Sequence, residues 1–237
     1  MIQSIVKPEG LIKNCIKFEP EKPGVYPSLV WLHGLNSTWD REGLGKQMKD
    51  GHQVNAVVYC PSNPSQGDWS RLEMNDVVEI MSKGNHLWHE VYGYSQGGMG
   101  VMGAINHHPD FWKLAGIIAG KTGLTNYEKY KNIIIRAWHG KSDRQMGFSI
   151  YKFIQGVAAC GGDATLIEYN EAHDIDEEAC SLTDPNSIWK WRESKINVPE
   201  PEPEPLPQPA SLEALNGELF VVIAGMRYKL SVTLTEV

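Results

Sequence analysis

Cysteine is scarce and scattered in this sequence. The four cysteines form no CxxC pair and lie far apart, at Cys15, Cys60, Cys160 and Cys180. This spacing argues against the usual zinc-binding patterns and against a small fold held together by disulfides. We therefore expect reduced thiols, no metal site and a cytoplasmic location.

Basic clusters and long apolar runs are also lacking. No stretch gathers enough Lys or Arg to neutralise a series of phosphates, and the formal net charge is -7, so we expect no nucleic-acid partner. Nowhere do about 18 uncharged apolar residues follow one another, as a membrane span requires. The N-terminal segment MIQSIVKPEG has no basic stretch followed by an apolar one. The sequence thus predicts neither membrane association nor a signal peptide.

A run rich in Pro and Glu marks the main boundary in the chain. Residues 198–210, VPEPEPEPLPQPA, favour an extended polyproline path and predict a spacer. It separates residues 1–197, long enough to bury a full core, from a tail at 211–237. In the tail, two β-rich runs at 218–224 and 228–235 predict a hairpin. Because a lone hairpin is marginal in water, we expect it to pack on the larger domain, to pair with other copies or to dock on a larger assembly.

Residues 1–197 alternate short apolar runs with amphipathic ones, which predicts an α/β domain with a mostly parallel sheet and helices on both faces. Continuous apolar runs fit strands that are buried on both sides. The strand candidates are 27–32, 55–60, 90–94, 114–119, 132–138 and 165–169, with 11–18 as a peripheral antiparallel strand. Helices are expected at 70–83 and 147–159, and a last helix from Asp184 with Pro185 in its first turn.

One short segment carries the strongest chemical signal. Residues 93–97, Gly-Tyr-Ser-Gln-Gly, match G-x-S-x-G and continue from the strand candidate 90–94. A serine on a tight strand-to-helix turn is forced outward, and the glycines are needed because a Cβ would collide with the neighbouring strand and helix. A glycine-rich turn that happens to contain serine is the alternative. The interpretation of Ser95 as a nucleophile therefore requires partner residues.

Such partners follow two later strand candidates, in the order expected of this fold. Asp143 comes after the strand at 132–138, and His173 comes after the strand at 165–169. A serine hydroxyl is a poor nucleophile at its free pKa, so an imidazole must take its proton and a carboxylate must orient the imidazole. We predict Ser95 as nucleophile, His173 as general base and Asp143 as the orienting acid.

Other side chains could fill the last two roles. They are Asp174, Asp176, His107, His108 and His139. The two histidines at the end of the helix expected after Ser95 should lie far from it. The histidine just before Asp143 is too close to it in sequence to meet it across the site.

An oxyanion hole is the fourth component of this chemistry. It needs the backbone amide of the residue after the nucleophile and a second amide from the loop after an early strand. Residues 29–36, LVWLHGLN, offer that loop. We assign the donors to the amides of Leu35 and Gln96, with His33 and Gly34 shaping the turn. We expect His33 to be a packed structural histidine rather than a base.

Together these segments resemble the phospholipase/carboxylesterase group of α/β-hydrolases, which includes acyl-protein thioesterases and small carboxylesterases. The similar segments, in the same order, are LHGL at 32–35, GYSQGG at 93–98, HG at 139–140, Asp143 and His173. The resemblance covers roughly residues 27–195. It implies the α/β-hydrolase fold and hydrolysis of esters or thioesters through an acyl-enzyme, with no metal or organic cofactor.

The expected pocket wall departs from that group. Residues 63–69, NPSQGDW, are short and polar where the group carries a longer aromatic and glycine-containing segment, and the stretch from 114 to 132 leaves no room for a sizeable lid. We name Trp69, Tyr94 and Met146 as candidate substrate-binding residues.

Three functional hypotheses remain open at this point. The first is a carboxylesterase acting on a small-molecule or glycan ester. The second is a polysaccharide-deacylating esterase that the tail tethers to a virion, particle or surface. The third is a non-enzymatic binding protein on a hydrolase scaffold, which would be expected to lack one of Ser95, Asp143 and His173. All three residues are present.

Overall fold

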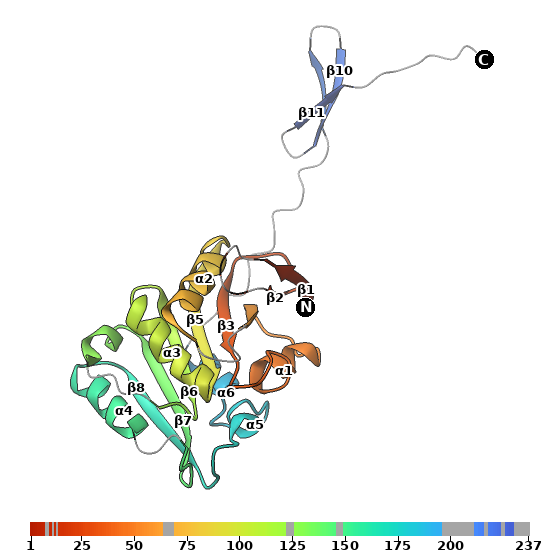
Figure 1. Ribbon diagram of the computed structural model, residues 1–237. Helices are drawn as coiled ribbons and strands as arrows, with labels where there is room; N and C mark the ends of the chain where they lie inside the picture. The colour runs from red at the N-terminus through yellow and green to blue at the C-terminus, as the bar shows by residue number, and fades with distance from the viewer. Residues whose placement is uncertain are drawn as a thin grey trace. The chain divides into compact units, whose positions relative to one another are not determined.

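Eight strands form the central sheet of the protein, in the order β1-β2-β4-β3-β5-β6-β7-β8 (Figure 1). Their bounds are β1 (Ile2–Val6), β2 (Asn14–Glu19), β3 (Tyr26–Leu32), β4 (Val57–Ser62), β5 (His86–Tyr94), β6 (Trp112–Ile118), β7 (Ile134–Gly140) and β8 (Ala164–Tyr169). Strands β3 to β8 pair in parallel, whereas β2 pairs antiparallel with both β1 and β4. The parallel strands therefore bring the loops at their carboxyl ends to one edge of the sheet.

The computed structural model describes most of the chain. The described residues are 1–7, 10, 12, 14–63, 69–121, 126–145 and 149–195, together with the backbone of 211–215, 218–223 and 226–229. The chain divides into two units, Met1–Pro199 and Glu200–Val237.

Helices cover both faces of the sheet. They are α1 (Gly43–Lys49), α2 (Arg71–Ser82), α3 (Gln96–His107), the 3-10 helix η1 (Tyr127–Tyr130), α4 (Ser149–Ala159), α5 (Asp176–Ala179) and α6 (Ile188–Lys195). Helices α2, α3 and α4 bury their apolar side chains in one core cluster, while α1, α5 and α6 contribute to a second cluster. Across the described ranges, no helix is both long and apolar enough to cross a membrane.

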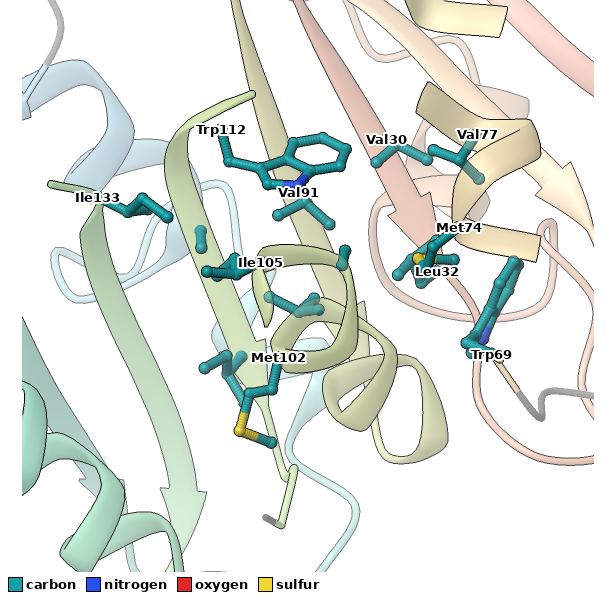
Figure 2. Close-up of a cluster of buried hydrophobic side chains, with 14 of the residues drawn as sticks. Val30, Leu32, Trp69, Met74, Val77, Val91, Met102, Ile105, Trp112 and Ile133 are labelled. Carbon is teal, nitrogen blue, oxygen red and sulfur yellow. The ribbon is translucent and has the colours of Figure 1, made fainter. Parts of the chain in front are cut away.

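The alternation of side chains along β3 explains why its sequence is mostly apolar. All of β3 is buried. Val30 and Leu32 belong to the cluster shared with α2 and α3 (Figure 2), whereas Leu29 and Trp31 belong to the cluster on the other face. Since successive residues of a strand point to opposite faces, a strand covered on both sides is apolar at most positions. The buried polar residue of β3, Ser28, has its hydroxyl 2.6 Å from the Nδ1 of His89.

The six central strand predictions correspond to β3 to β8, and the peripheral antiparallel strand corresponds to β2. The largest difference at a strand start is in β5, which begins at His86 rather than at residue 90. Its first four residues are partly buried or exposed, so they lack the apolar signal of a central strand. Strand β1 was not predicted, because this edge strand buries little of its surface.

The predicted start of the last helix is wrong. Helix α6 begins at Ile188, not at Asp184. The Asp184 carboxylate accepts a hydrogen bond from the Asn186 amide at 2.7 Å, and its carbonyl accepts one from Ser187 at 3.1 Å. Asp184 therefore forms a separate turn before the helix, as Asp side chains often do.

The second unit contains its own sheet. Strands β9 (Ser211–Leu215), β10 (Glu218–Ile223) and β11 (Met226–Lys229) pair antiparallel in the order β11-β10-β9. The expected hairpin corresponds to β10 and β11, although β11 begins at Met226 rather than at residue 228, and residues 230–237 lie outside the described ranges. Strand β9 was not predicted, because its sequence SLEAL is rich in helix-favouring residues. Pairing with β10 decides its conformation.

Candidate active site

Ser95 occupies the turn between β5 and α3. Its backbone dihedral angles are φ 55° and ψ -115°, a combination that residues with a Cβ rarely adopt. The Ser95 amide donates to the Ile118 carbonyl at 2.9 Å, and the Ser95 carbonyl accepts from the Met99 amide at 3.1 Å. One bond connects the turn to β6 and the other connects it to α3. The neighbouring elements therefore maintain the strained conformation of Ser95.

The glycines around Ser95 permit close contact between three elements. A Cβ on Gly97 would collide with the Leu32 carbonyl oxygen at the end of β3, and a Cβ on Gly93 would collide with the backbone of Gly97. The collision expected from the G-x-S-x-G pattern is therefore present. Without side chains at these positions, α3 can begin directly against β3 and β5.

His173 links Ser95 to Asp143. Its Nε2 atom lies 2.9 Å from the Ser95 Oγ, and its Nδ1 atom lies 2.8 Å from the Asp143 Oδ2. All three residues are buried, with exposed fractions of 8%, 8% and 6% for Ser95, His173 and Asp143. The structure thus brings together the three residues that the sequence singled out. In this arrangement the imidazole can accept the serine proton on one nitrogen while the carboxylate holds the other.

Direct contact between the loops after β7 and β8 brings the acid and the base together. The Lys141 amide donates to the Tyr169 carbonyl at 2.9 Å, so the pairing of the two strands continues into their loops. A Cβ on Gly140 would collide with the backbone of the β8 loop. Close approach at Gly140 therefore places Asp143 within reach of His173.

The alternative acids make other contacts. The Asp174 carboxylate accepts a hydrogen bond from the Tyr94 hydroxyl at 3.2 Å. The Asp176 carboxylate accepts one from the Gly43 amide at 3.2 Å. The carboxylate on the Nδ1 atom of His173 is that of Asp143.

The alternative bases make contacts other than with Ser95. His107 ends α3, and Ser95 precedes the first residue of this 12-residue helix, which at 1.5 Å per residue separates them by about 18 Å. His108 follows the helix, and its Nε2 atom contacts the Asn75 side chain at 2.9 Å. His139 is buried in β7, with its ring 5.5 Å from that of Tyr151.

His33 has the structural role expected of it. Its Nε2 atom accepts a hydrogen bond from the Asn63 amide at 3.3 Å, which leaves Nδ1 to donate to the Gly34 carbonyl at 2.9 Å. Burial lowers the pKa of His33, although the bond to Gly34 acts in the opposite direction. A neutral, bonded imidazole of this kind shapes the turn after β3.

Trp69 is not a pocket residue, contrary to prediction. Its side chain is buried in the cluster that also contains Leu32 and Met74 (Figure 2). Its indole Nε1 donates to the His33 carbonyl at 2.9 Å, and a Cβ on Gly100 of α3 would collide with its side chain. Trp69 therefore stabilises the turn after β3 from the side of the hydrophobic core. Met146 lies outside the described residues.

A pocket of about 490 Å³ opens at Ser95 and His173. Leu35 and Gln96, the expected oxyanion donors, line it together with Tyr94. The ring of Tyr94 lies 5.3 Å from that of His173, and burial is the main cause that raises its pKa. Glu42, a residue that the sequence patterns did not indicate, lines the same pocket.

A larger pocket of about 650 Å³ lies beside α6 and contains no residue of the Ser95, His173 and Asp143 group. We assign the chemistry to the smaller pocket because the three interacting side chains are there. Among the described residues, no three His, Cys, Asp or Glu side chains cluster as a metal ion would require.

Compared by sequence, the chain matches no protein-family model and no curated protein. Compared by structure, it is similar to a thermostable esterase, with a TM-score of 0.58 and 20% identity over 81% of this chain and 60% of that one. A CE1 ferulic acid esterase from the anaerobic fungus Anaeromyces mucronatus has a TM-score of 0.59 and 14% identity, over 77% of this chain and 87% of that one. An esterase from Pyrococcus furiosus has a TM-score of 0.59 and 11% identity, with 82% and 91% covered. At these identities the likeness shows the fold, and the prediction of an α/β-hydrolase fold is confirmed.

Proposed function

We propose that this chain, which has the α/β-hydrolase fold, is a serine hydrolase that cleaves carboxylic esters or thioesters through an acyl-enzyme. The observation that carries the proposal is the continuous contact from the Ser95 hydroxyl through the His173 imidazole to the Asp143 carboxylate. A buried carboxylate on Nδ1 fixes the histidine tautomer that accepts a proton on Nε2.

The reaction then follows in two halves. The Ser95 Oγ attacks the substrate carbonyl carbon as its proton passes to the Nε2 of His173, and Asp143 stabilises the imidazolium that results. When the tetrahedral intermediate collapses, the bond to the leaving alcohol or thiol breaks and His173 returns the proton to it. In the second half, water attacks the acyl-enzyme as its proton passes to His173. Collapse of this second intermediate releases the acid, and His173 returns the proton to the Ser95 Oγ.

The negative charge on the former carbonyl oxygen needs donors that are already in position. Gln96 is the first residue of α3, so its amide has no acceptor within the helix and lies at the positive end of the helix dipole. Leu35 follows the His33–Gly34 turn and lines the same pocket as Ser95. We assign the two amides as the oxyanion hole.

The neighbours in structure support ester substrates, since the three described above are named as esterases. The LHGL and GYSQGG segments favour the phospholipase/carboxylesterase group within this fold. A small-molecule or glycan ester in the cytoplasm is the substrate we propose. The separate β9–β11 sheet favours one alternative, a polysaccharide-deacylating esterase tethered to a virion or particle through its tail. A binding protein without activity fits less well, because Ser95, His173 and Asp143 are all present and in contact.

A fluorophosphonate probe tests the proposal directly. The probe should label wild-type protein at Ser95, and Ser95→Ala should abolish labelling and lower kcat/KM at least about 1000-fold, as triad losses do. Ser82→Ala is the matched control, because Ser82 is exposed at the end of α2 and its hydroxyl donates to the Val78 carbonyl of the same helix. A panel of acetyl, butyryl, octanoyl and feruloyl esters would then define the acyl group. Activity that survives Ser95→Ala would refute the mechanism.

A further inference from the structure

One carboxylate in the pocket has no part in the mechanism above. Glu42 lies immediately before α1 and lines the same pocket as Ser95 and His173. Its side chain is partly buried, and its Oε1 atom accepts a hydrogen bond from the Gly34 amide. A carboxylate that is partly withdrawn from water is stabilised by such a donor. The bond connects the residue before α1 to the turn after β3.

That turn carries the Leu35 amide. It is closed by a hydrogen bond from the Ser37 amide to the Gly34 carbonyl at 3.3 Å, and Asn36 within it has a φ of 57°. The Ser37 side chain lies close enough to the Glu42 carboxyl to lower its pKa, while the Ser37 hydroxyl donates to the Thr38 carbonyl at 3.5 Å. Glu42 therefore holds the turn at Gly34, directly before Leu35.

The other side of the turn is held by neutral groups. The His33 imidazole donates to the Gly34 carbonyl, and the Trp69 indole donates to the His33 carbonyl. A Cβ placed on Gly34 would lie 3.5 Å from the Cβ of Ser95 and 3.2 Å from the Oε1 of Glu42. The contact between Glu42 and Gly34 is therefore next to the nucleophile.

Glu42 also brings charge to the site. Burial raises the pKa of its carboxyl, while the bonds from Gly34 and Ser37 lower it, and Asp176 and His173 act in opposite directions on it through their charges. The Glu42 carboxyl therefore interacts electrostatically with the ring that accepts the Ser95 proton. The other charged or titratable groups around this part of the site are Asp143, Asp174, Asp176, His139, Lys121 and Tyr94.

We propose that Glu42 is a positioning residue of the serine hydrolase proposed above. Its carboxylate holds the turn so that the Leu35 amide faces the oxyanion, and its charge favours the protonated His173 that forms with that oxyanion. Both effects are largest in the transition state, so they act on kcat rather than on substrate binding. The inference rests on the proposed function.

Two variants separate the two effects. Glu42→Ala removes the acceptor and the charge, and kcat should fall about 10- to 100-fold with KM changed less than about twofold. Glu42→Gln keeps an oxygen for the Gly34 amide, so kcat on the alkaline plateau should stay within about threefold of wild type. Loss of the negative charge should move the acid limb of its kcat/KM profile to lower pH, by about half a pH unit.

Glu177→Gln is the matched control, because Glu177 is an exposed acid of α5 whose carboxylate pairs with Lys46 at 3.3 Å. It should change neither kcat nor the pH profile. If Glu42→Ala does not fold, as circular dichroism would show, the pH profile of Glu42→Gln still decides.

Wild-type kcat in Glu42→Ala, a loss in Glu42→Gln as large as in Glu42→Ala, or an unmoved acid limb in Glu42→Gln would overturn the inference. The probe separates this failure from that of the proposed function. Labelling of Ser95 that persists in the Glu42 variants leaves the serine mechanism intact, whereas absence of labelling in wild type removes both.

Discussion

The Nδ1 atom of His173 lies 2.8 Å from the Oδ2 of Asp143, although the two residues are 30 positions apart in sequence. The Asp143 side chain is fully shielded from solvent, and that of His173 is 11% exposed. The second carboxylate oxygen of Asp143 accepts a hydrogen bond from the Gln145 amide at 2.8 Å. The carboxylate is therefore held from two directions, and it orients the ring toward Ser95.

Asp143→Asn should lower kcat at least about 1000-fold, because an amide can donate to Nδ1 and so favour the wrong histidine tautomer. The matched control is Asp174→Asn. Asp174 is exposed, and its carboxylate accepts a hydrogen bond from the Tyr94 hydroxyl at 3.2 Å rather than from His173, so kcat should stay within about threefold. Steady-state kinetics on one soluble ester compares the two. Inactivation by Asp174→Asn together with an active Asp143→Asn would show that the acid is misassigned.

Gly97→Ala should destabilise the protein and inactivate it, because the new Cβ collides with the Leu32 carbonyl oxygen and pushes α3 away from β3. Gly103→Ala on the same helix is the control. A Cβ there would have the Trp69 carbonyl oxygen, at 3.9 Å, as its nearest neighbour. Alanine should therefore stabilise the helix by up to about 1 kcal/mol. Thermal melting and kcat measured on both variants test this, and equal melting temperatures would contradict it.

Arg192→Met should lower the free energy of unfolding by about 3–5 kcal/mol, because it leaves the buried Glu90 carboxylate without its counter-charge. The Arg192 Nε and Nη2 atoms lie 2.7 and 2.8 Å from the two Glu90 oxygens. Tyr92 and Trp88 donate to the same carboxylate. Urea denaturation measures the loss, and adding Glu90→Gln should recover part of it. A loss of less than about 1 kcal/mol would mean that the pair does not tie α6 to β5.

The protein should lose stability as the pH falls from about 6.5 to 4. Burial lowers the pKa of His89 from 6.5 to about 4, with a smaller contribution from His86. His89 stacks on Phe111 at 3.9 Å, and its Nδ1 contacts the Ser28 hydroxyl at 2.6 Å. In this window the unfolded chain binds a proton that the folded chain does not, so the free energy of unfolding rises with pH. The stability that neutral His89 contributes is fully present above the pKa of His89 in the unfolded chain. It declines as the pH falls toward the pKa of His89 in the folded protein.

His89→Gln should reduce that slope. The contribution of His89 should be well below about 3 kcal/mol between the ends of the window, because the side chain is only partly buried and solvent screens its charge. His107→Gln is the control, since His107 is exposed at the end of α3 and should change the slope far less. The test is to measure the melting temperatures of wild type and both variants from pH 4 to 7. Parallel plots of melting temperature against pH for His89→Gln and wild type would count against the prediction.

Truncation after Val198 should leave an active, monomeric hydrolase, because Ser95, Asp143 and His173 all precede the cut. Within the described residues, β9 and β11 are the edge strands of the tail sheet. Edge strands present unpaired backbone groups that can add further strands, so the full-length protein should self-associate or bind a larger structure. Light scattering on both forms measures this. Equal masses, with a sharp fall in melting temperature on truncation, would show that the tail belongs to the core.

Local sequence patterns were enough to predict the central strands of this protein and its candidate catalytic residues. The central strands are mostly apolar because both of their faces are covered, and this signal can be recognised without knowing which segments lie beside each strand. The Gly-Tyr-Ser-Gln-Gly turn and the order of Asp143 and His173 after strand ends are local in the same sense. The candidate triad could therefore be predicted before the fold.

Only the tertiary structure decided which partners the other side chains contact. Trp69 was expected in the pocket but packs behind the β3 turn, and Asp184 was expected to begin a helix but forms a turn. Glu42 belongs to no pattern, because its role depends on Gly34 and Ser37 meeting its carboxylate beside Ser95. Periodicity and motif spacing report the burial and the local conformation of a segment, whereas the partners of a side chain come from other segments that folding brings beside it.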